Sequence, residues 1–215
     1  MKIVIQLVLT AVIAVLGYYT YKSVYGPVEF NKIKEERYQD VIVKLKDIRD
    51  AEMAHREITG KFTGSYDSLI RFVDTAQYVV TQRKDTTYLD EEYKKNYGVD
   101  KYVEDVVIDT LGYTSVKDSL FKKTDRYKKM MYVPFTDDKK FELEAGFLQK
   151  DKSKIAVFRA RVDKSDILSD LNQDLVVQEK QTIAVDGVNG THIKVGSMSE
   201  VTTSGNWPKN YGDND

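Results

Sequence analysis

The sequence predicts an α+β protein in which an N-terminal transmembrane helix continues into a long amphipathic helix packed on an antiparallel β-sheet. Three observations predict this. Residues 3–21 carry no formal charge. Residues 28–58 place apolar side chains three and four positions apart, the period of a helix with one buried face. Segments 140–149 and 154–162 alternate apolar with charged residues, which is typical of strands with one face in solvent.

The uncharged stretch from Ile3 to Tyr21 is long enough to cross a bilayer. Its 19 residues would rise about 29 Å as a helix, close to the ~30 Å of a hydrocarbon core. The tyrosines at its end suit a membrane interface. The alternative is a cleaved signal peptide, but Val15 and Gly17 form a poor small-x-small cleavage site. We therefore expect an uncleaved anchor in the lipid bilayer.

One face of this helix offers small or hydrogen-bonding side chains for close contact with a partner helix. The four residues are Gln6, Thr10, Ala14 and Gly17. None of them ionises, whereas a proton-carrying helix usually holds Asp, Glu or His. We expect the helix to anchor or to pack rather than to conduct.

Composition excludes several classes of protein. The chain has 33 basic and 34 acidic residues, which leaves no electrostatic footprint for nucleic acid. It has no cysteine, so disulfides and thiolate sites are excluded. The 41% of apolar residues indicates an ordered domain.

The flanking charges give an ambiguous membrane orientation. Lys2 precedes the apolar helix, and several basic residues, Lys22 among them, follow it, so the positive-inside rule does not favour export. A very short tail followed at once by an apolar helix nevertheless resembles the signal-anchors of exported bacterial proteins. We expect a single-pass protein of the bacterial inner membrane with the bulk of the chain in the periplasm.

Glycines mark the expected boundaries between the elements in the first third of the chain. Gly26-Pro27 is expected to interrupt the helix with a kink or short break, because proline removes a backbone donor. Gly60 is expected to cap the amphipathic helix, and Ser65 to cap a short helix that follows. The sequence therefore predicts an anchor (1–25), an amphipathic helix (26–58), an α+β domain (59–200) and a polar tail (201–215).

The middle and end of the chain alternate strand and helix signals. Each predicted segment has its own composition. We expect strands at 78–81, 103–113, 129–135, 140–149, 154–162, 182–185 and 192–195, a surface excursion that is partly helical at 83–101, and helices at 115–121 and after Ser165. The end, 202–215, is expected to be mobile apart from Trp207.

The layout resembles type IV pilins and the pseudopilins of secretion systems. The similar stretch runs from Ile48-Arg-Asp-Ala-Glu-Met-Ala-His55 into Gly60-Lys-Phe-Thr-Gly-Ser-Tyr-Asp-Ser-Leu69. The resemblance implies a pilin-like fold. The chain departs from the family because it shows no prepilin leader and no Gly-Phe junction, and Ile5 stands where pilins have an assembly glutamate.

The chain is also similar to a group of single-pass Gram-negative envelope proteins with this layout. The shared closing segment runs from Val195-Gly-Ser-Met-Ser-Glu200 to Gly205-Asn-Trp207. This resemblance implies integral membrane partners, namely an ExbB/ExbD-type proton-driven motor that energises TonB-dependent transport. A secretion or pilus complex is the alternative.

No pattern indicates catalysis, a cofactor or a metal site. His55 and His192 are the only histidines, and nothing in their spacing suggests a triad or a metal cluster. Acidic pairs such as Asp137-Asp138 lack the spacing of a calcium loop. We therefore expect a non-enzymatic structural or coupling subunit. A tethered module that binds peptidoglycan or glycan through its 15 tyrosines is a further alternative.

Overall fold

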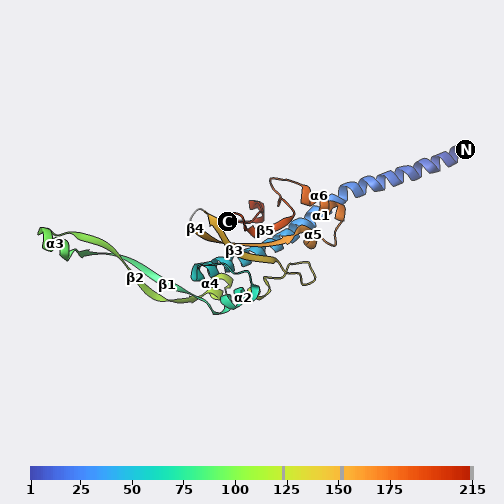
Figure 1. Ribbon diagram of the computed structural model, residues 1–215. Coiled ribbons are helices and arrows are strands. Elements are labelled where there is room, and N and C mark those ends of the chain that lie inside the picture. Colours follow the sequence, from blue (N-terminus) through green and yellow to red (C-terminus); the bar gives the residue numbers. More distant parts are fainter. Residues whose placement is uncertain (123, 151–152, 214–215) are drawn as a thin grey trace.

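The computed structural model describes residues 1–122, 124–150 and 153–213, and it is α+β with antiparallel sheets, as predicted. Figure 1 shows three parts in a row, which are a bare helix, a packed head and a projecting arm. The helices and strands are α1 (Lys2–Thr59), α2 (Tyr66–Thr75), β1 (Gln77–Leu89), α3 (Glu91–Tyr97), β2 (Tyr102–Ser115), α4 (Val116–Phe121), η1 (Arg126–Lys129), β3 (Glu142–Lys150), β4 (Ser153–Asp163), α5 (Lys164–Ile167), α6 (Gln173–Gln181), β5 (His192–Gly196) and η2 (Lys209–Tyr211).

Helix α1 is continuous over 58 residues and ends, as predicted, at Gly60, whose φ is 77°. The predicted break at Gly26-Pro27 is wrong, because Pro27 lies inside the continuous helix, and a kink there stays a prediction. A proline withdraws only one amide hydrogen from the helical ladder. The packing that begins at Phe30 holds the turns beyond it.

The head is built on the second half of α1. From Phe30 onward, apolar side chains on one face of the helix are buried, and Tyr38, Leu45 and Ile48 are fully so. The helix contacts β4 and β5, and residues of these strands join the same core. The expected packing of the amphipathic helix on an antiparallel sheet is confirmed.

The sheet of the head has the strand order β3-β4-β5, with both pairs antiparallel. The predicted hairpin is confirmed, and β3 and β4 pair from Glu142↔Arg161 onward. Strand β5 ends at Gly196, which has a φ of 73°. A β-carbon at Gly196 would lie 2.3 Å from the carbonyl oxygen of Phe158, so this position requires glycine.

The arm consists of β1, α3 and β2 and projects from the end of the head that faces away from the N-terminus (Figure 1). Its strands pair antiparallel from Gln77↔Ser115 to Leu89↔Tyr102, with a bulge after Val80. The expected excursion at 83–101 is therefore partly wrong, since residues 83–89 continue β1. The partly helical character is confirmed by α3, whose first turn is capped by the Asp90 carboxylate.

Two other predicted elements are different in the structure. Residues 129–135 do not form a strand, because Tyr127 and Met130 turn inward three residues apart, and only the single bridge Tyr132↔Lys140 remains. The single helix expected after Ser165 is divided into α5 and α6, whose first turns are capped by the side chains of Asp163 and Asn172.

The last part of the chain packs against the head. Residues 182–185 form no strand, and the Asn189 side chain instead accepts a hydrogen bond from the amide of Ala184. Trp207 is 1% exposed, and the amide of Asn206 donates to the carbonyl of Lys194 in β5. The exception expected for Trp207 is confirmed, and the mobility of the other described tail residues stays a prediction.

Candidate functional site

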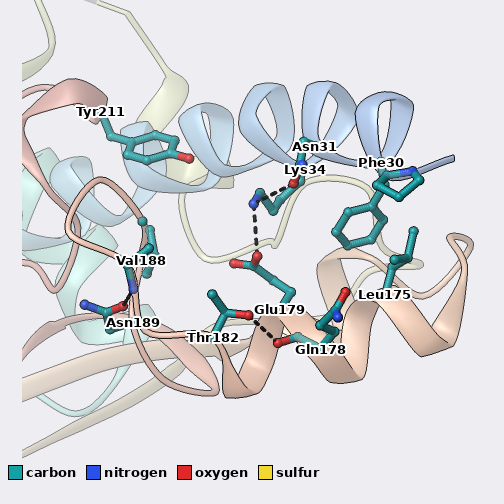
Figure 2. A pocket seen from close by; sticks show the side chains of 13 residues that line it. Phe30, Asn31, Lys34, Leu175, Gln178, Glu179, Thr182, Val188, Asn189 and Tyr211 are labelled. Atoms are coloured by element: carbon teal, nitrogen blue, oxygen red, sulfur yellow. Dashed lines mark hydrogen bonds and ion pairs between the residues drawn. The ribbon is translucent and has the colours of Figure 1, made fainter. Parts of the chain in front are cut away.

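A pocket of about 250 Å³ opens where α1 enters the head (Figure 2). One wall is α1 and the other is α6 with the loop that follows it. The lining is mixed, with apolar residues beside charged and amide groups. It comprises Pro27, Phe30, Asn31, Lys34, Leu175, Gln178, Glu179, Thr182, Ala184, Gly187, Val188, Asn189 and Tyr211.

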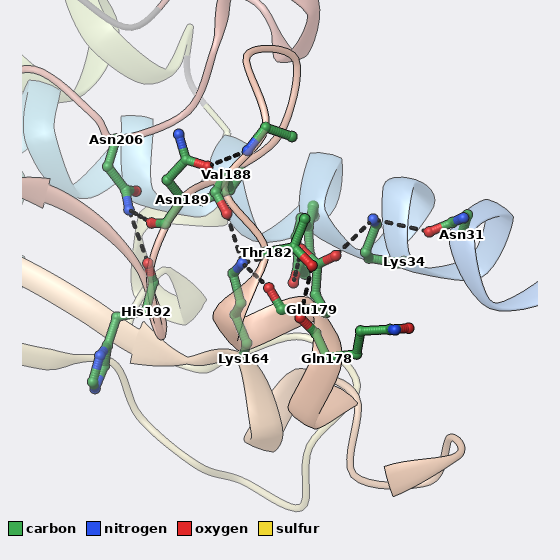
Figure 3. A network of polar contacts seen from close by, with 12 residues as sticks. Asn31, Lys34, Lys164, Gln178, Glu179, Thr182, Val188, Asn189, His192 and Asn206 are labelled. Atoms are coloured by element: carbon green, nitrogen blue, oxygen red, sulfur yellow. Dashed lines mark hydrogen bonds and ion pairs between the residues drawn. The ribbon is translucent and has the colours of Figure 1, made fainter. Parts of the chain in front are cut away.

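The carboxylate of Glu179 lies between two lysines at the edge of this pocket (Figure 3). Lys34 Nζ on α1 is 2.9 Å from Glu179 Oε2, and Lys164 Nζ is 3.0 Å from Glu179 Oε1. The hydroxyl of Tyr38 also donates to Glu179 Oε1, at 3.4 Å. The Glu179 carboxylate of α6 thus joins this helix to α1 and to the start of α5.

Lys164 is the buried member of this network, with its side chain 0% exposed. Its ammonium also donates to the carbonyl of Val188 at 2.6 Å and lies 5.7 Å from the ring centroid of Tyr38. Burial lowers the pKa of Lys164, while the hydrogen bond to Glu179 opposes that shift. Burial, with the charge of Glu179, raises the pKa of the Tyr38 hydroxyl.

This network is suited to fastening α1 to the head. A lysine of lowered pKa in a pocket is a feature of catalytic sites. Here, however, the Lys164 ammonium is already engaged by a carboxylate and a carbonyl, and Lys34 also donates to Asn31. Because these donors are directed at fixed acceptors of the protein itself, they hold α1, α6 and the loop at Val188 in one arrangement.

Glu52 is a second buried carboxylate on α1, and it lies at the turn after the helix. Its Oε2 accepts a hydrogen bond from the amide of Thr63 at 2.9 Å, and its Oε1 has no hydrogen-bond partner within the described part of the chain. Burial raises the pKa of Glu52 to about 8, although the hydrogen bond from Thr63 opposes the rise. This carboxylate is therefore costly to ionise in place.

The four residues predicted for partner-helix contact lie in the bare part of α1. Gln6, Thr10, Ala14 and Gly17 are all exposed, and steps of four, four and three place them on one side of the helix. The hydroxyl of Thr10 donates to the carbonyl of Gln6 at 2.9 Å. No atom lies within 4 Å of the place where a side chain at Gly17 would begin, so this side is open to another helix.

This segment of α1 is long and apolar enough to span a membrane, and none of its most apolar window is buried by the rest of the protein. Anchor length and exposure therefore agree with the prediction from sequence. The structure adds that the same helix passes without a break into the head.

The two histidines lie apart from the network around Glu179. His55 Nδ1 is 2.7 Å from the carbonyl of Lys61, and its ring packs on Phe72. His192 Nε2 lies 3.7 Å from a carboxylate oxygen of Asp163. Across residues 1–122, 124–150 and 153–213, no three His, Asp or Glu side chains gather as a metal site would require.

Sequence reasoning missed the network, and it predicted the arm only in part, with strands at 78–81 and 103–113 but without their pairing into one long hairpin. Nothing in the sequence marks Lys34, Lys164 and Glu179 as neighbours, because they come together only through tertiary packing. The arm had a signal, since the valines, threonines and tyrosines that favour strands extend well beyond the predicted strand at 78–81. Comparison with family models, curated proteins and solved structures finds no match for this chain.

Proposed function

We propose that this chain is a non-enzymatic, membrane-anchored subunit that holds a rigid head and arm outside the bilayer as a structural or coupling element. The observation that carries the proposal is the continuity of α1. One helix supplies the apolar, exposed segment and also the central face of the head core. The head is therefore fixed directly to the anchor, and no linker separates them.

The network around Glu179 supports the same proposal. It fastens α6 and the loop at Val188 to α1 close to the point where the bare helix ends. Force or movement applied to the anchor would thus reach the head through Lys34 as well as through the apolar core. This arrangement suits a part that transmits position rather than one that turns over a substrate.

The partners that we propose are integral membrane proteins of the bacterial inner membrane, with the head in the periplasm. Among these, an ExbB/ExbD-type motor that energises TonB-dependent transport is the first candidate, from the resemblance of the closing segment. The contact would use the side of α1 that carries Thr10, Ala14 and Gly17, where small residues permit close approach of a second helix.

Bulky substitution of that side tests the proposal. Full-length chains with Ala14→Trp or Gly17→Trp should stay in the membrane fraction but lose at least tenfold of the membrane proteins that copurify in mild detergent. Val12→Trp is the matched control, because Val12 lies on the opposite side of the same helix and should leave copurification unchanged. Unchanged copurification of both Ala14→Trp and Gly17→Trp would rule out this interface, and recovery of the wild-type chain in the aqueous fraction would rule out the anchor.

Two alternatives remain from the sequence. A pseudopilin-like subunit would carry a processed and modified N-terminus, which intact-mass measurement of the purified chain detects. A module that binds peptidoglycan or glycan would sediment with cell-wall sacculi, which the full-length chain in detergent should not do if the first proposal is right.

A further inference from the structure

The arm exposes apolar side chains that no other part of the described chain covers. Val79 is 54% exposed, Ile108 65% and Tyr113 68%. Neither outer edge of the arm pairs with a further strand among the described residues. A two-stranded hairpin alone is at best marginally stable in water, and an open strand edge is a template for pairing with another chain. The arm therefore has the features of a surface that another strand completes.

The two edges of the arm carry opposite charge. Strand β1 contains two basic residues, Arg83 and Lys84, and one acidic residue, Asp85, so its formal charge is +1. Strand β2 holds only acidic charged residues, Glu104, Asp105 and Asp109, a formal charge of −3. Among the described residues, Arg83 and Asp85 form an ion pair at 3.4 Å, whereas Lys84 and Asp109 form none. The basic edge of one arm therefore complements the acidic edge of another.

Membrane anchoring fixes the relative direction of neighbouring copies. All anchored copies share one orientation, and in each copy β1 leads away from the head and β2 returns to it (Figure 1). When two copies stand side by side, β2 of one and β1 of the next consequently run antiparallel. Two like edges brought together would run parallel, which is the less stable pairing, and would place like charges opposite each other.

We propose that copies of this chain associate through their arms, with β2 of one copy pairing with β1 of the next. Lys84 of one copy would then face the carboxylates of Asp105 and Asp109 of its neighbour. In the hairpin, Lys84 is in register with Val107, and residues two positions away on the partner strand lie on the same face. Repeating this register between copies places both carboxylates beside the lysine.

This interface is heterologous, so each copy uses one edge for each of two neighbours. Such contacts close into a ring when the rotation from one copy to the next is a whole fraction of 360°. The inference rests on the membrane anchoring that we propose above, because anchoring supplies the common orientation. The competing explanation is that the edge charges keep the arms apart, as charges on exposed edges often do.

Cysteine cross-linking distinguishes these explanations, and the natural chain, which has no cysteine, supplies a clean background. Thr81 and Thr110 are partners across the hairpin and are both exposed. Two differently tagged full-length chains, one with Thr81→Cys and one with Thr110→Cys, are coexpressed and their membranes are treated with a short thiol cross-linker. We expect a mixed dimer at least fivefold more abundant than the dimer from either variant alone.

The outcomes separate this inference from the anchoring proposal. Cross-linking that is strongest with Thr81→Cys alone or Thr110→Cys alone would overturn the pairing of unlike edges, and no product in any combination would show that the arms stay apart. In both cases a chain recovered in the membrane fraction leaves the anchor intact. A chain missing from that fraction would instead remove the proposed function.

Charge reversal gives a second, independent test on the same cysteine chains. An acidic arm (Arg83→Glu with Lys84→Glu) and a basic arm (Glu104→Lys, Asp105→Lys and Asp109→Lys) should each reduce cross-linking at least tenfold when expressed alone. Expressing the acidic and basic variants together should restore it, because every interface then joins opposite charges. Undiminished cross-linking of the separate variants would contradict the proposed interface.

Discussion

The sheet of the head and the sheet of the arm are both antiparallel, but only the first is covered by a helix. In β4, Phe158 and Ala160 are fully buried against the core that α1 provides. In β2, Val107 and Ile108 are 43% and 65% exposed although their strand is longer than any in the head. Strand length and pairing are thus not what distinguishes the stable sheet from the exposed one.

The difference shows where the free energy of folding resides. The strands of the head are stabilised by burial of apolar surface, at about 25 cal/mol per Å². The strands of the arm rely on cross-strand pairs, each worth roughly 0.2–1 kcal/mol. We therefore expect the head to unfold as one cooperative unit. The stability of the arm should instead depend on its own cross-strand contacts.

The largest expected effect comes from truncating one aromatic or aliphatic side chain in each sheet. Phe158→Ala should lower the free energy of unfolding of the head by about 3–5 kcal/mol, because it removes a fully buried ring and leaves a cavity. Ile108→Ala, on the exposed arm, should change it by less than about 0.5 kcal/mol. Urea unfolding of full-length protein in detergent, followed by the fluorescence of the single tryptophan, Trp207, measures both.

A similar loss of unfolding free energy in both variants would mean that the arm packs against another part of the same chain. That result would favour an arm folded back on the head in solution, and it would remove the contrast.

The network around Glu179 provides the next test, because it belongs to the head alone. Lys164→Met should destabilise the head by about 2–4 kcal/mol, since it leaves a largely buried carboxylate with one cation fewer and removes the donor to the Val188 carbonyl. Lys34→Met, the less buried partner of the same carboxylate, should cost about 1 kcal/mol. Hydrogen exchange should show both losses in α6 and neither in the arm. Faster exchange throughout β1 and β2 would contradict the separation of the two parts.

The next expected effect concerns pH and Glu52. Its folded-state pKa of about 8 lies above the ordinary value of a glutamate, so between these values the folded state holds a proton that the unfolded state has lost. Stability attributable to Glu52 is therefore fully present below about pH 4, and it is lost progressively as the pH rises toward 8. Glu52→Gln should stabilise the head at pH 9 by on the order of 2 kcal/mol and flatten the pH dependence.

The control for this prediction is Glu36→Gln, an exposed glutamate on the same helix. It should leave the dependence of the urea midpoint on pH as it is in the natural chain. If Glu52→Gln behaves like Glu36→Gln, the carboxylate is not held in a water-poor site.

The helical and hairpin parts of the head could be predicted from sequence because their signals are local. The apolar period of α1, the glycine at position 60 and the alternation in β3 and β4 each specify their own element. The break at Pro27 was predicted wrongly because a local penalty was weighed without the packing that opposes it. The strand predicted at 129–135 failed for a similar reason, since burial of Tyr127 and Met130 decides that segment.

The candidate sites were less predictable than the fold. The ion pairs of Glu179 join residues separated by 145 and 15 positions. No local sequence pattern indicates that such residues are in contact. The arm was predicted only in part, because the polar and charged residues at 83–89 masked the continuation of a strand whose two faces are both in solvent. The helix positions Gln6, Thr10, Ala14 and Gly17 were accessible to sequence reasoning because they depend only on helical periodicity, and their contact with a partner stays a prediction.

The unbroken course of α1 makes the anchor and head a single lever. About 57 Å of helix lies beyond Tyr21, and the arm adds roughly 44 Å beyond the head if its strands extend fully. A tilt of about 10° at the bilayer would then sweep the distal tip sideways by roughly 17 Å. If α1 is anchored as we propose, a small rocking of the bare helix would therefore be converted into a much larger displacement of the tip of the arm.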